Sequence, residues 1–514
     1  MDGLNYEPLP STSDASHPSS SASTRRRWVI LRCCPSGIAA HAAALLAILT
    51  IFLVALIVRA FTVENDPDFG LGMMELVQRK GYPIERHDVT TRDGYVLGVY
   101  RIPHGRSMSG RTDGLAGMNG DQGEEQGLLS EKLSRRSGGR WQKLRRALLG
   151  EKKESDKGGS AADRPVRGVV FLQHGLLDSS LCWVINQPSE SLAFVLADAG
   201  YDVWMGNNRG NALSLGHVRL DHKKDSEYWD FSFDDFARED LPAMLGHTLR
   251  VGGVRHIDAY IGHSQGSTQA FAAFSRDRAL SSHVNFFVAL APVTAVKHQK
   301  SPVFNVLAKM SADEALRVFG VNEFMPQAPL LQRVVPELCQ LYPYGCELAL
   351  VPIVGPPYKL NETRIPVYMS MGSSGTSVKN IRHWAQAVRE GTFCEFDYGC
   401  KTPGDHSECE NWKRYGQVTP RDYDVGSLGV PVALFFGTSD LLADPKDVEL
   451  LISKLEAADR KIVLTKLVQG YSHLDFTWGM DAQKDIYGDI LAMLAKQQVT
   501  GPIGDVATDN VQPY

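Results

Sequence analysis

The chain has 514 residues, of which 43% are hydrophobic and 22% charged, and its formal net charge at pH 7 is -5. This length allows a large buried core in one or two domains. The nearly balanced charge gives no reason to expect a nucleic acid partner. The cysteines form no CxxC pair, so their spacing argues against a structural zinc site.

The N-terminal region consists of a polar stretch followed by an apolar one. Residues 1–37 are rich in Ser, Thr and Pro and are predicted to form a disordered cytosolic tail. Residues 38–58 contain no formally charged side chain and are long enough to span the core of a bilayer. A cleaved signal peptide is the competing interpretation, but the long polar lead-in and the length of the apolar run argue against it. We therefore expect an uncleaved transmembrane helix at 38–58.

Charged residues beside this segment predict its orientation. Arg25–Arg27 and Arg32 precede it, whereas acidic residues follow it from Glu64 onward. Because cytosolic flanks are enriched in Lys and Arg, the N-terminus is expected in the cytosol of a single-pass protein of the endoplasmic reticulum, secretory pathway or plasma membrane. Cys33 and Cys34 are either palmitoylation sites or plain juxtamembrane thiols.

A folded region begins near Met73 and is interrupted early. Residues 73–104 predict a β-hairpin at the start of a domain. Residues 105–166 are rich in Gly, Ser, Lys, Arg and Glu and predict a low-complexity insertion. Within it, residues 140–149 form a basic amphipathic pattern that fits either an anionic lipid surface or a solvated linker. The first alternative would suit a cytosolic surface or a lipid droplet, so the side of the membrane stays open.

The rest of the chain predicts an α/β fold with an inserted cap. Apolar runs separated by helical segments occur in 167–292 and return in 428–495, which favours a mostly parallel sheet with helices on both faces. Residues 293–427 lack this alternation and are predicted to form a cap or lid, and residues 496–514 a flexible tail. The apolar runs expected to be strands are Val169–Gln173, Tyr201–Met205, Ile257–Ile261, Phe286–Leu290, Val432–Phe436 and Lys461–Val468.

The sequence Gly262-His-Ser264-Gln-Gly266 follows one of these strands and precedes a helical segment. This arrangement is typical of a nucleophile elbow, a sharp turn that exposes a serine hydroxyl. Glycines at both ends would let the strand and the helix approach closely without a Cβ clash. Ser264 is therefore the candidate nucleophile.

A serine nucleophile needs a base, and the base needs an orienting carboxylate. Asp440 follows the strand Val432–Phe436, and we favour it over its neighbours Asp444 and Asp447, which are expected to cap a loop or helix. His473 follows the last strand and is the only histidine C-terminal to Asp440. The order Ser, Asp, His therefore selects it as the base.

A tetrahedral intermediate also needs backbone N–H donors for its oxyanion. Gln265 would supply one because it directly follows the nucleophile. The loop after the strand Val169–Gln173 should supply the other, and Leu176 is the candidate. His174 is expected to brace this loop, and His263 to have a structural role.

Taken together, the motifs resemble the acid lipase family of α/β hydrolases, which includes lysosomal acid lipase and gastric lipase. The N-terminal layout looks most like the fungal membrane-anchored steryl ester hydrolases. The matching segments are Gly81–Pro83, Thr91–Tyr95, Arg101–Pro103, His174–Ser180, Gly206–Asn211, Asp240–Ala243, Gly262–Gly266, Gly375–Ser377, His383–Gln386, Phe396–Gly399, Asp440–Pro445 and His473–Phe476. The resemblance implies the α/β-hydrolase fold, a triad of Ser264, Asp440 and His473, oxyanion donors at Leu176 and Gln265, and a lid that opens at a lipid surface.

Two features of the cap depend on the compartment. Asn361-Glu-Thr is the only N-glycosylation sequon, and it can be used only if the cap is lumenal. Cys339 and Cys346 could close a short loop in an oxidising compartment, and buried free thiols are the alternative.

These observations predict a membrane-anchored serine lipase that hydrolyses steryl esters through an acyl-enzyme, without a metal or organic cofactor. A triacylglycerol lipase is the alternative within the class. A lipid-binding protein on a catalytically silent hydrolase fold and an acyltransferase are the alternatives outside it. The expected partners are a lipid ester and a membrane or lipid-droplet surface.

Overall fold

The computed structural model describes residues 66–106, 166–309, 321–325, 329–400 and 408–500, together with positions 44, 47 and 50. Contacts divide the chain into two units, residues 1–62 and 63–514. The predicted N-terminal tail, most of the predicted anchor and nearly all of the 105–166 insertion lie outside the described residues. Among the residues that are described, no helix is both long and apolar enough to cross a membrane.

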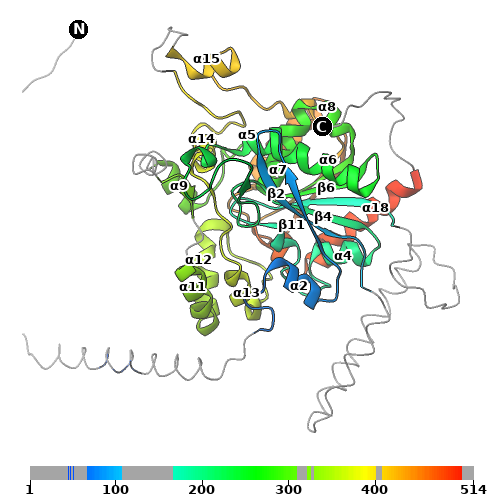
Figure 1. Cartoon of the computed structure of the whole chain (residues 1–514), viewed down its shortest axis with the longest axis vertical. Helices are drawn as coiled ribbons and strands as arrows, with labels where there is room; N and C mark the ends of the chain where they lie inside the picture. The colour runs from blue at the N-terminus through cyan, green and yellow to red at the C-terminus, as the bar shows by residue number, and fades with distance from the viewer. Residues whose placement is uncertain are drawn as a thin grey trace, which may run out of the picture. The chain divides into compact units, whose positions relative to one another are not determined.

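The second unit is built on one central sheet (Figure 1). Its strands lie in the order β1-β2-β4-β3-β6-β7-β10-β11, and the short β5 pairs with β2. Strand β2 runs antiparallel to its neighbours, whereas the pairs from β4 to β11 are parallel. The strands are β1 Glu85–Thr90, β2 Tyr95–Ile102, β3 Val169–Gln173, β4 Asp202–Gly206, β5 Gly216–His217, β6 Ile257–His263, β7 Val284–Leu290, β10 Val432–Gly437 and β11 Ile462–Val468.

Helices cover both faces of this sheet. Figure 1 shows α6, α7 and α8 on one face and α4 and α18 on the other. Among the described residues, the α-helices outside the cap are α2 Met73–Arg79, α4 Leu192–Asp198, α5 Phe233–Asp235, α6 Leu241–Gly252, α7 Gln265–Arg276, α8 Arg278–Ser282, α16 Pro445–Ala457, α17 Asp475–Trp478 and α18 Gly488–Thr500. This architecture confirms the predicted α/β-hydrolase fold with a mostly parallel sheet.

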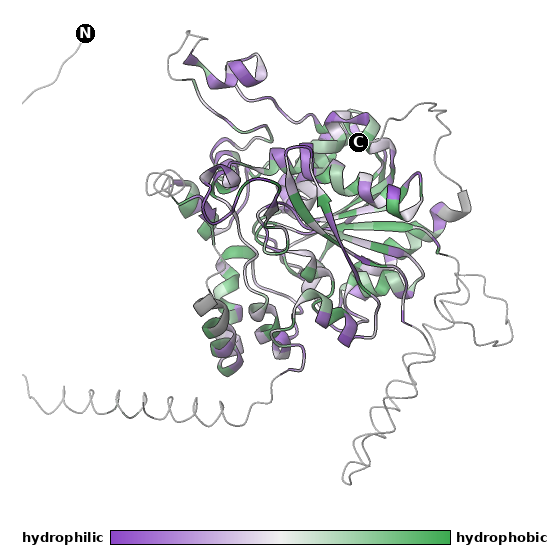
Figure 2. Cartoon of the chain, viewed as in Figure 1, coloured by the Kyte–Doolittle hydropathy of each residue, from purple (hydrophilic) through white to green (hydrophobic). Residues whose placement is uncertain are grey.

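Burial explains why the predicted strands were easy to recognise. Every residue of β3, β4 and β10 is buried, as expected for parallel strands covered by helices on both sides. The edge strand β11 instead alternates between partly buried and exposed residues along most of its length. Figure 2 shows the central strands at the hydrophobic end of the colour scale.

The C-terminal boundary differs from the prediction. Helix α18 continues to Thr500, past the expected end of the core at 495. The sequence from Lys496 to Val499 contains no helix breaker, and the first one is Gly501-Pro502. The predicted flexible tail therefore starts too early, and the residues after Thr500 lie outside the described part.

The cap region, residues 293–427, contributes no strand to the central sheet in the part that the structure describes. It contains a small antiparallel pair, β8–β9, and several helices. These elements are β8 Glu323–Phe324, β9 Thr376–Ser377, α9 Pro302–Lys309, α11 Pro329–Leu341, α12 Pro343–Val354, α13 Ile365–Ser370, α14 Val378–Glu390 and α15 Glu410–Tyr415.

Two disulfides lie in this cap. Cys339 and Cys346 are bonded and join α11 to α12. A second bond joins Cys400 to Cys409, a pair that the sequence did not single out. Cys182 and Cys394 are buried free thiols.

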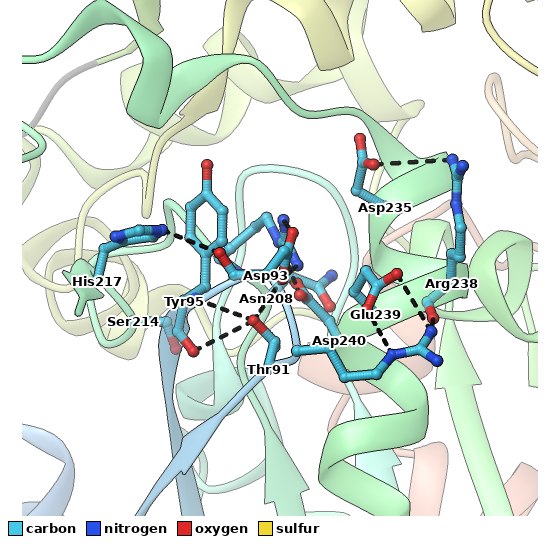
Figure 3. A network of polar contacts seen from close by, with 12 residues as sticks. Thr91, Asp93, Tyr95, Asn208, Ser214, His217, Asp235, Arg238, Glu239 and Asp240 are labelled. Carbon is cyan, nitrogen blue, oxygen red and sulfur yellow. Dashed lines mark hydrogen bonds and ion pairs between the residues drawn. The ribbon is translucent and has the colours of Figure 1, made fainter. Parts of the chain in front are cut away.

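A buried ion network lies beside the ends of β2 and β4 (Figure 3). The guanidinium of Arg209 donates from Nε to Asp240 at 2.7 Å and from Nη2 to Asp93 at 2.9 Å. The same group lies 3.9 Å from the centroid of the Tyr95 ring. Arg209 and Asp240 are almost completely buried, so each charge depends on the other for compensation.

Because Arg209 lies in the loop that follows β4, its bonds to Asp240 and Asp93 fix this loop. The backbone N–H of Asn208 donates to Nε2 of His174 at 3.2 Å, and Nδ2 of Asn211 donates to the carbonyl of Asp178 at 2.9 Å. The loop after β4 therefore holds both ends of the loop after β3, where Leu176 lies. In this way the ion network contributes to the placement of the candidate oxyanion donor.

Replacement of Asp240 tests how much the fold depends on this network. The substitution Asp240→Asn leaves Arg209 buried with one carboxylate partner fewer, and we expect the free energy of unfolding to fall by about 3 kcal/mol. Denaturant unfolding followed by circular dichroism measures this change. The matched control is Asp88→Asn, because the Arg86–Asp88 ion pair is about half exposed, and a loss below about 1 kcal/mol is expected there. Equal losses in the two variants would contradict this account.

Candidate active site

The turn at Ser264 has an unusual backbone conformation. Strand β6 ends at His263 and α7 begins at Gln265, so Ser264 alone makes the reversal, with φ of 53° and ψ of -121°. A positive φ is costly for a residue with a side chain and persists only where the surroundings enforce it. The Ser264 carbonyl accepts a hydrogen bond of 2.6 Å from the Ser267 hydroxyl, and its N–H donates to the Leu290 carbonyl at 3.0 Å. These contacts fix the turn.

Two glycines make this turn possible. A Cβ on Gly262 would collide with the backbone of Gly266, and a Cβ on Gly266 would collide with the carbonyl of Gln173 in β3. Strand β6, helix α7 and the end of β3 are therefore in direct backbone contact. The spacing Gly-x-Ser-x-Gly that the sequence showed is a steric requirement of this packing.

The structure brings together the three side chains that the sequence selected. Oγ of Ser264 lies 2.7 Å from Nε2 of His473, and Nδ1 of His473 lies 2.9 Å and 3.0 Å from the two carboxylate oxygens of Asp440. All three residues are buried. A carboxylate can only accept, so Nδ1 of His473 holds the proton and Nε2 is left to accept from the Ser264 hydroxyl.

The Asp440 carboxylate is held by its own loop. Its Oδ1 accepts hydrogen bonds of 2.8 Å from the N–H groups of Leu442 and Ala443, which start the turn after β10. The rival carboxylates have other partners. Asp444 caps α16 through the N–H of Lys446, and Asp447 binds His298.

Both candidate oxyanion donors belong to segments that adjoin Ser264. Gln265 is the first residue of α7, where a backbone N–H has no intrahelical acceptor. The loop after β3 passes close to Ser264, because a Cβ on Gly175 would lie 3.0 Å from Cβ of Ser264. The next residue, Leu176, lines the same cavity as Ser264 and His473.

Two further histidines support the site in their neutral form. Nε2 of His263 donates to the backbone carbonyl of His473 at 2.8 Å, so the elbow holds the loop that bears the candidate base. Nδ1 of His174 donates to the Gly175 carbonyl at 2.7 Å, and its Nε2 accepts from Asn208. Burial lowers the pKa of His174 to about 4 and, with the nearby His473 imidazole, lowers the pKa of His263 to about 3.

An apolar cavity of about 580 Å³ opens onto Ser264 and His473. Its wall comes from the loop after β3 and from the cap, and most of its side chains are aliphatic or aromatic. Such a cavity can take up a long hydrocarbon chain beside a nucleophilic hydroxyl. The cap residues that line it include Phe304, Met325, Val335, Leu350, Ile353 and Trp384.

One ionisable group in this cavity was missed by the sequence reasoning. Asp178 lines the wall, and burial raises the pKa of its carboxyl to about 6. It lies in the segment His174–Ser180, where the sequence pattern gave individual roles to His174 and Leu176 alone. Within the described residues no group of His, Cys, Asp and Glu side chains is arranged to hold a metal ion.

Comparison with known proteins gives matches along most of the chain. A family model described as a partial alpha/beta-hydrolase lipase region matches residues 73–187, and one described as the alpha/beta hydrolase fold matches residues 168–479. Human lipase member K is 36% identical over 432 residues, covering 84% of this chain and 92% of that protein. Gastric triacylglycerol lipase of Bos taurus is 37% identical, covering 85% and 94%. Lipase lipl-1 of Caenorhabditis elegans is 35% identical, covering 85% and 95%.

The buried neutral His263 predicts a specific pH dependence. In the unfolded chain this histidine takes up a proton below about pH 6.5, whereas in the folded protein it stays neutral until about pH 3. Acid therefore favours the unfolded state at this position. When the pH is lowered from 7 to 5, the free energy of unfolding of wild type should fall by about 2 kcal/mol more than that of His263→Gln. Urea unfolding of both proteins at both pH values measures these changes. Equal changes in the two proteins would contradict the assignment of a buried neutral His263.

Proposed function

The chain belongs to the lipase family of α/β hydrolases and is a carboxylic ester hydrolase, and from this premise we propose that Ser264, His473 and Asp440 are its catalytic triad. The observation that supports this most strongly is the unbroken hydrogen-bond chain from Ser264 Oγ through His473 to Asp440 at the wall of an apolar cavity. Nucleophile, base and orienting acid have the geometry that acyl transfer requires.

In the first half of the proposed reaction, Ser264 Oγ attacks the ester carbonyl while Nε2 of His473 takes the hydroxyl proton. The carbonyl oxygen becomes an oxyanion that the N–H groups of Leu176 and Gln265 stabilise. Asp440 stabilises the imidazolium through Nδ1. When the C–O bond to the alcohol breaks, His473 delivers its proton to the leaving alkoxide, and an acyl-Ser264 ester remains.

In the second half, water replaces the alcohol. His473 takes a proton from the water as its oxygen attacks the acyl carbonyl, and a second tetrahedral intermediate forms in the same oxyanion site. Collapse of this intermediate returns the proton to Ser264 Oγ and releases the fatty acid. Each proton transfer in the two half-reactions passes through His473, and water is the second substrate.

We assign steryl esters as the main substrates of the enzyme. The N-terminal layout, a polar tail followed by an uncharged apolar segment at 38–58, supports this assignment by its likeness to fungal membrane-anchored steryl ester hydrolases. The large apolar cavity is compatible with a bulky hydrophobic ester. Triacylglycerol is the second candidate, and it is favoured by relatives that are named gastric triacylglycerol lipases.

We also propose that residues 38–58 anchor the enzyme in a membrane with residues 1–37 in the cytosol and the hydrolase domain in the lumen. The arginines before the segment and the acidic residues after it support this orientation. The disulfides Cys339–Cys346 and Cys400–Cys409 are compatible with an oxidising compartment. A cytosolic enzyme on lipid droplets is the alternative.

The substitution Ser264→Ala tests the triad. It removes the attacking oxygen and leaves the buried surroundings intact, so turnover of cholesteryl oleate and trioleoylglycerol should fall at least about 10⁴-fold. The released fatty acid is measured, and a fluorophosphonate probe should label wild type but not the variant. Retained turnover would contradict the triad, and absence of labelling in wild type would favour a silent lipid-binding protein. The ratio of the two wild-type rates decides between the steryl ester and triacylglycerol assignments.

The sequon at Asn361 tests the proposed topology. Asn361 lies in a turn in the cap, where its Oδ1 accepts from the N–H and hydroxyl of Thr363. In a lumenal domain the protein from its native host should lose mass on treatment with an N-glycosidase, and Asn361→Gln should abolish the shift. Protease treatment of intact vesicles is the complementary measurement. Degradation of the hydrolase domain outside the vesicles would overturn the lumenal assignment.

A further inference from the structure

The side chain of Gln265 is held by the cap rather than by the hydrolase core. Its Oε1 accepts a hydrogen bond of 2.9 Å from Nδ2 of Asn380 and one of 2.7 Å from Nε1 of Trp384. Both donors lie on α14, four positions apart, and therefore on one face of that helix. The exposed fractions of the three residues are 2%, 0% and 6%. The residue that directly follows the nucleophile is thus joined to a cap helix through one buried acceptor.

Helix α14 is itself firmly positioned against the core. The hydroxyl of Ser377 caps its N-terminus by accepting from Asn380 N–H and donates to the carbonyl of Phe231. One turn later, the ring of His383 stacks on Phe233 with 3.7 Å between the centroids. The donors that reach Gln265 therefore belong to a helix with little freedom to shift.

Trp384 also forms part of the wall of the substrate cavity. One edge of its indole donates to Gln265, and the same ring system lines the space beside Ser264. A buried acceptor that loses its donors is costly, so Gln265 keeps a single orientation only while α14 holds it. The cap thereby reaches the candidate oxyanion site through a direct contact.

We propose that Asn380 and Trp384 are positioning residues that hold Gln265 so that its backbone N–H faces the oxyanion of the tetrahedral intermediate. This inference rests on the proposed function. Asn380 and Trp384 act through Gln265, so they affect a contact that strengthens only in the transition state. Their loss should lower kcat and leave KM nearly unchanged.

A double-mutant cycle tests the proposal. Trp384→Phe removes the Nε1–H donor and keeps an aromatic ring in the cavity wall, and Gln265→Met removes the acceptor at similar volume. Each single variant should lower kcat for p-nitrophenyl butyrate about tenfold and change KM less than about twofold. This loss in kcat is smaller than the loss expected when an oxyanion donor is removed completely. The double variant should be no slower than Gln265→Met, because both changes remove the same hydrogen bond.

Two further variants separate positioning from packing. Asn380→Leu removes the second donor and should give the same kcat loss, again without adding to Gln265→Met. Trp204→Phe makes the same chemical change as Trp384→Phe at a fully buried indole on β4 whose Nε1 has no partner among the described residues. It should keep the wild-type kcat. Thermal unfolding of all variants identifies any loss of kcat that is caused by a less stable fold.

The outcomes distinguish this inference from the proposed function. An active wild type with unchanged kcat in Trp384→Phe and Asn380→Leu would overturn the inference alone. Multiplicative losses in the double variants, or losses confined to KM, would also overturn it. A wild type that neither hydrolyses esters nor reacts with a fluorophosphonate would overturn the proposed function and the inference with it.

Discussion

Backbone packing around Ser264 is the constraint on which the site depends. Helix α7 approaches β6 and the end of β3 so closely that side chains at Gly262 or Gly266 would collide with backbone atoms. The approach forces Ser264 into a positive φ and turns its hydroxyl toward the cavity. The distance to His473 and the position of the first N–H of α7 both follow from this turn.

The parallel sheet brings the other residues of the site close to the turn at Ser264. Because β3, β6, β10 and β11 run in the same direction, the loops at their C-terminal ends meet at one edge of the sheet. These loops contain Leu176, Ser264, Asp440 and His473. Burial then sets their electrostatics, since the neighbouring His174 and His263 stay neutral and add no positive charge beside His473. The cap completes the enclosure and supplies the two donors that hold the side chain of Gln265.

Much of this arrangement could be predicted because it depends on local patterns. Fully buried strands appear as continuous apolar runs, and β3 matches its predicted bounds. The elbow follows from the glycine spacing, and chain order alone selected His473. The partners of Arg209 and the donors to Gln265, by contrast, join residues far apart along the chain. No periodicity or spacing reveals such contacts, because they depend on how the elements pack.

By itself, then, the amino-acid sequence determined a mostly parallel α/β sheet, the order of the strands along the chain and the residues selected as nucleophile, base and acid, because each follows from burial, turn sterics or chain order. The family resemblance added the expectation of the α/β-hydrolase fold. Only the tertiary structure decided that Ser264, His473 and Asp440 lie within hydrogen-bond distance of one another. It also decided that α14 of the cap reaches Gln265. The reason is physical: these contacts are made between elements far apart in sequence, and only the packing of the cap onto the sheet brings them together.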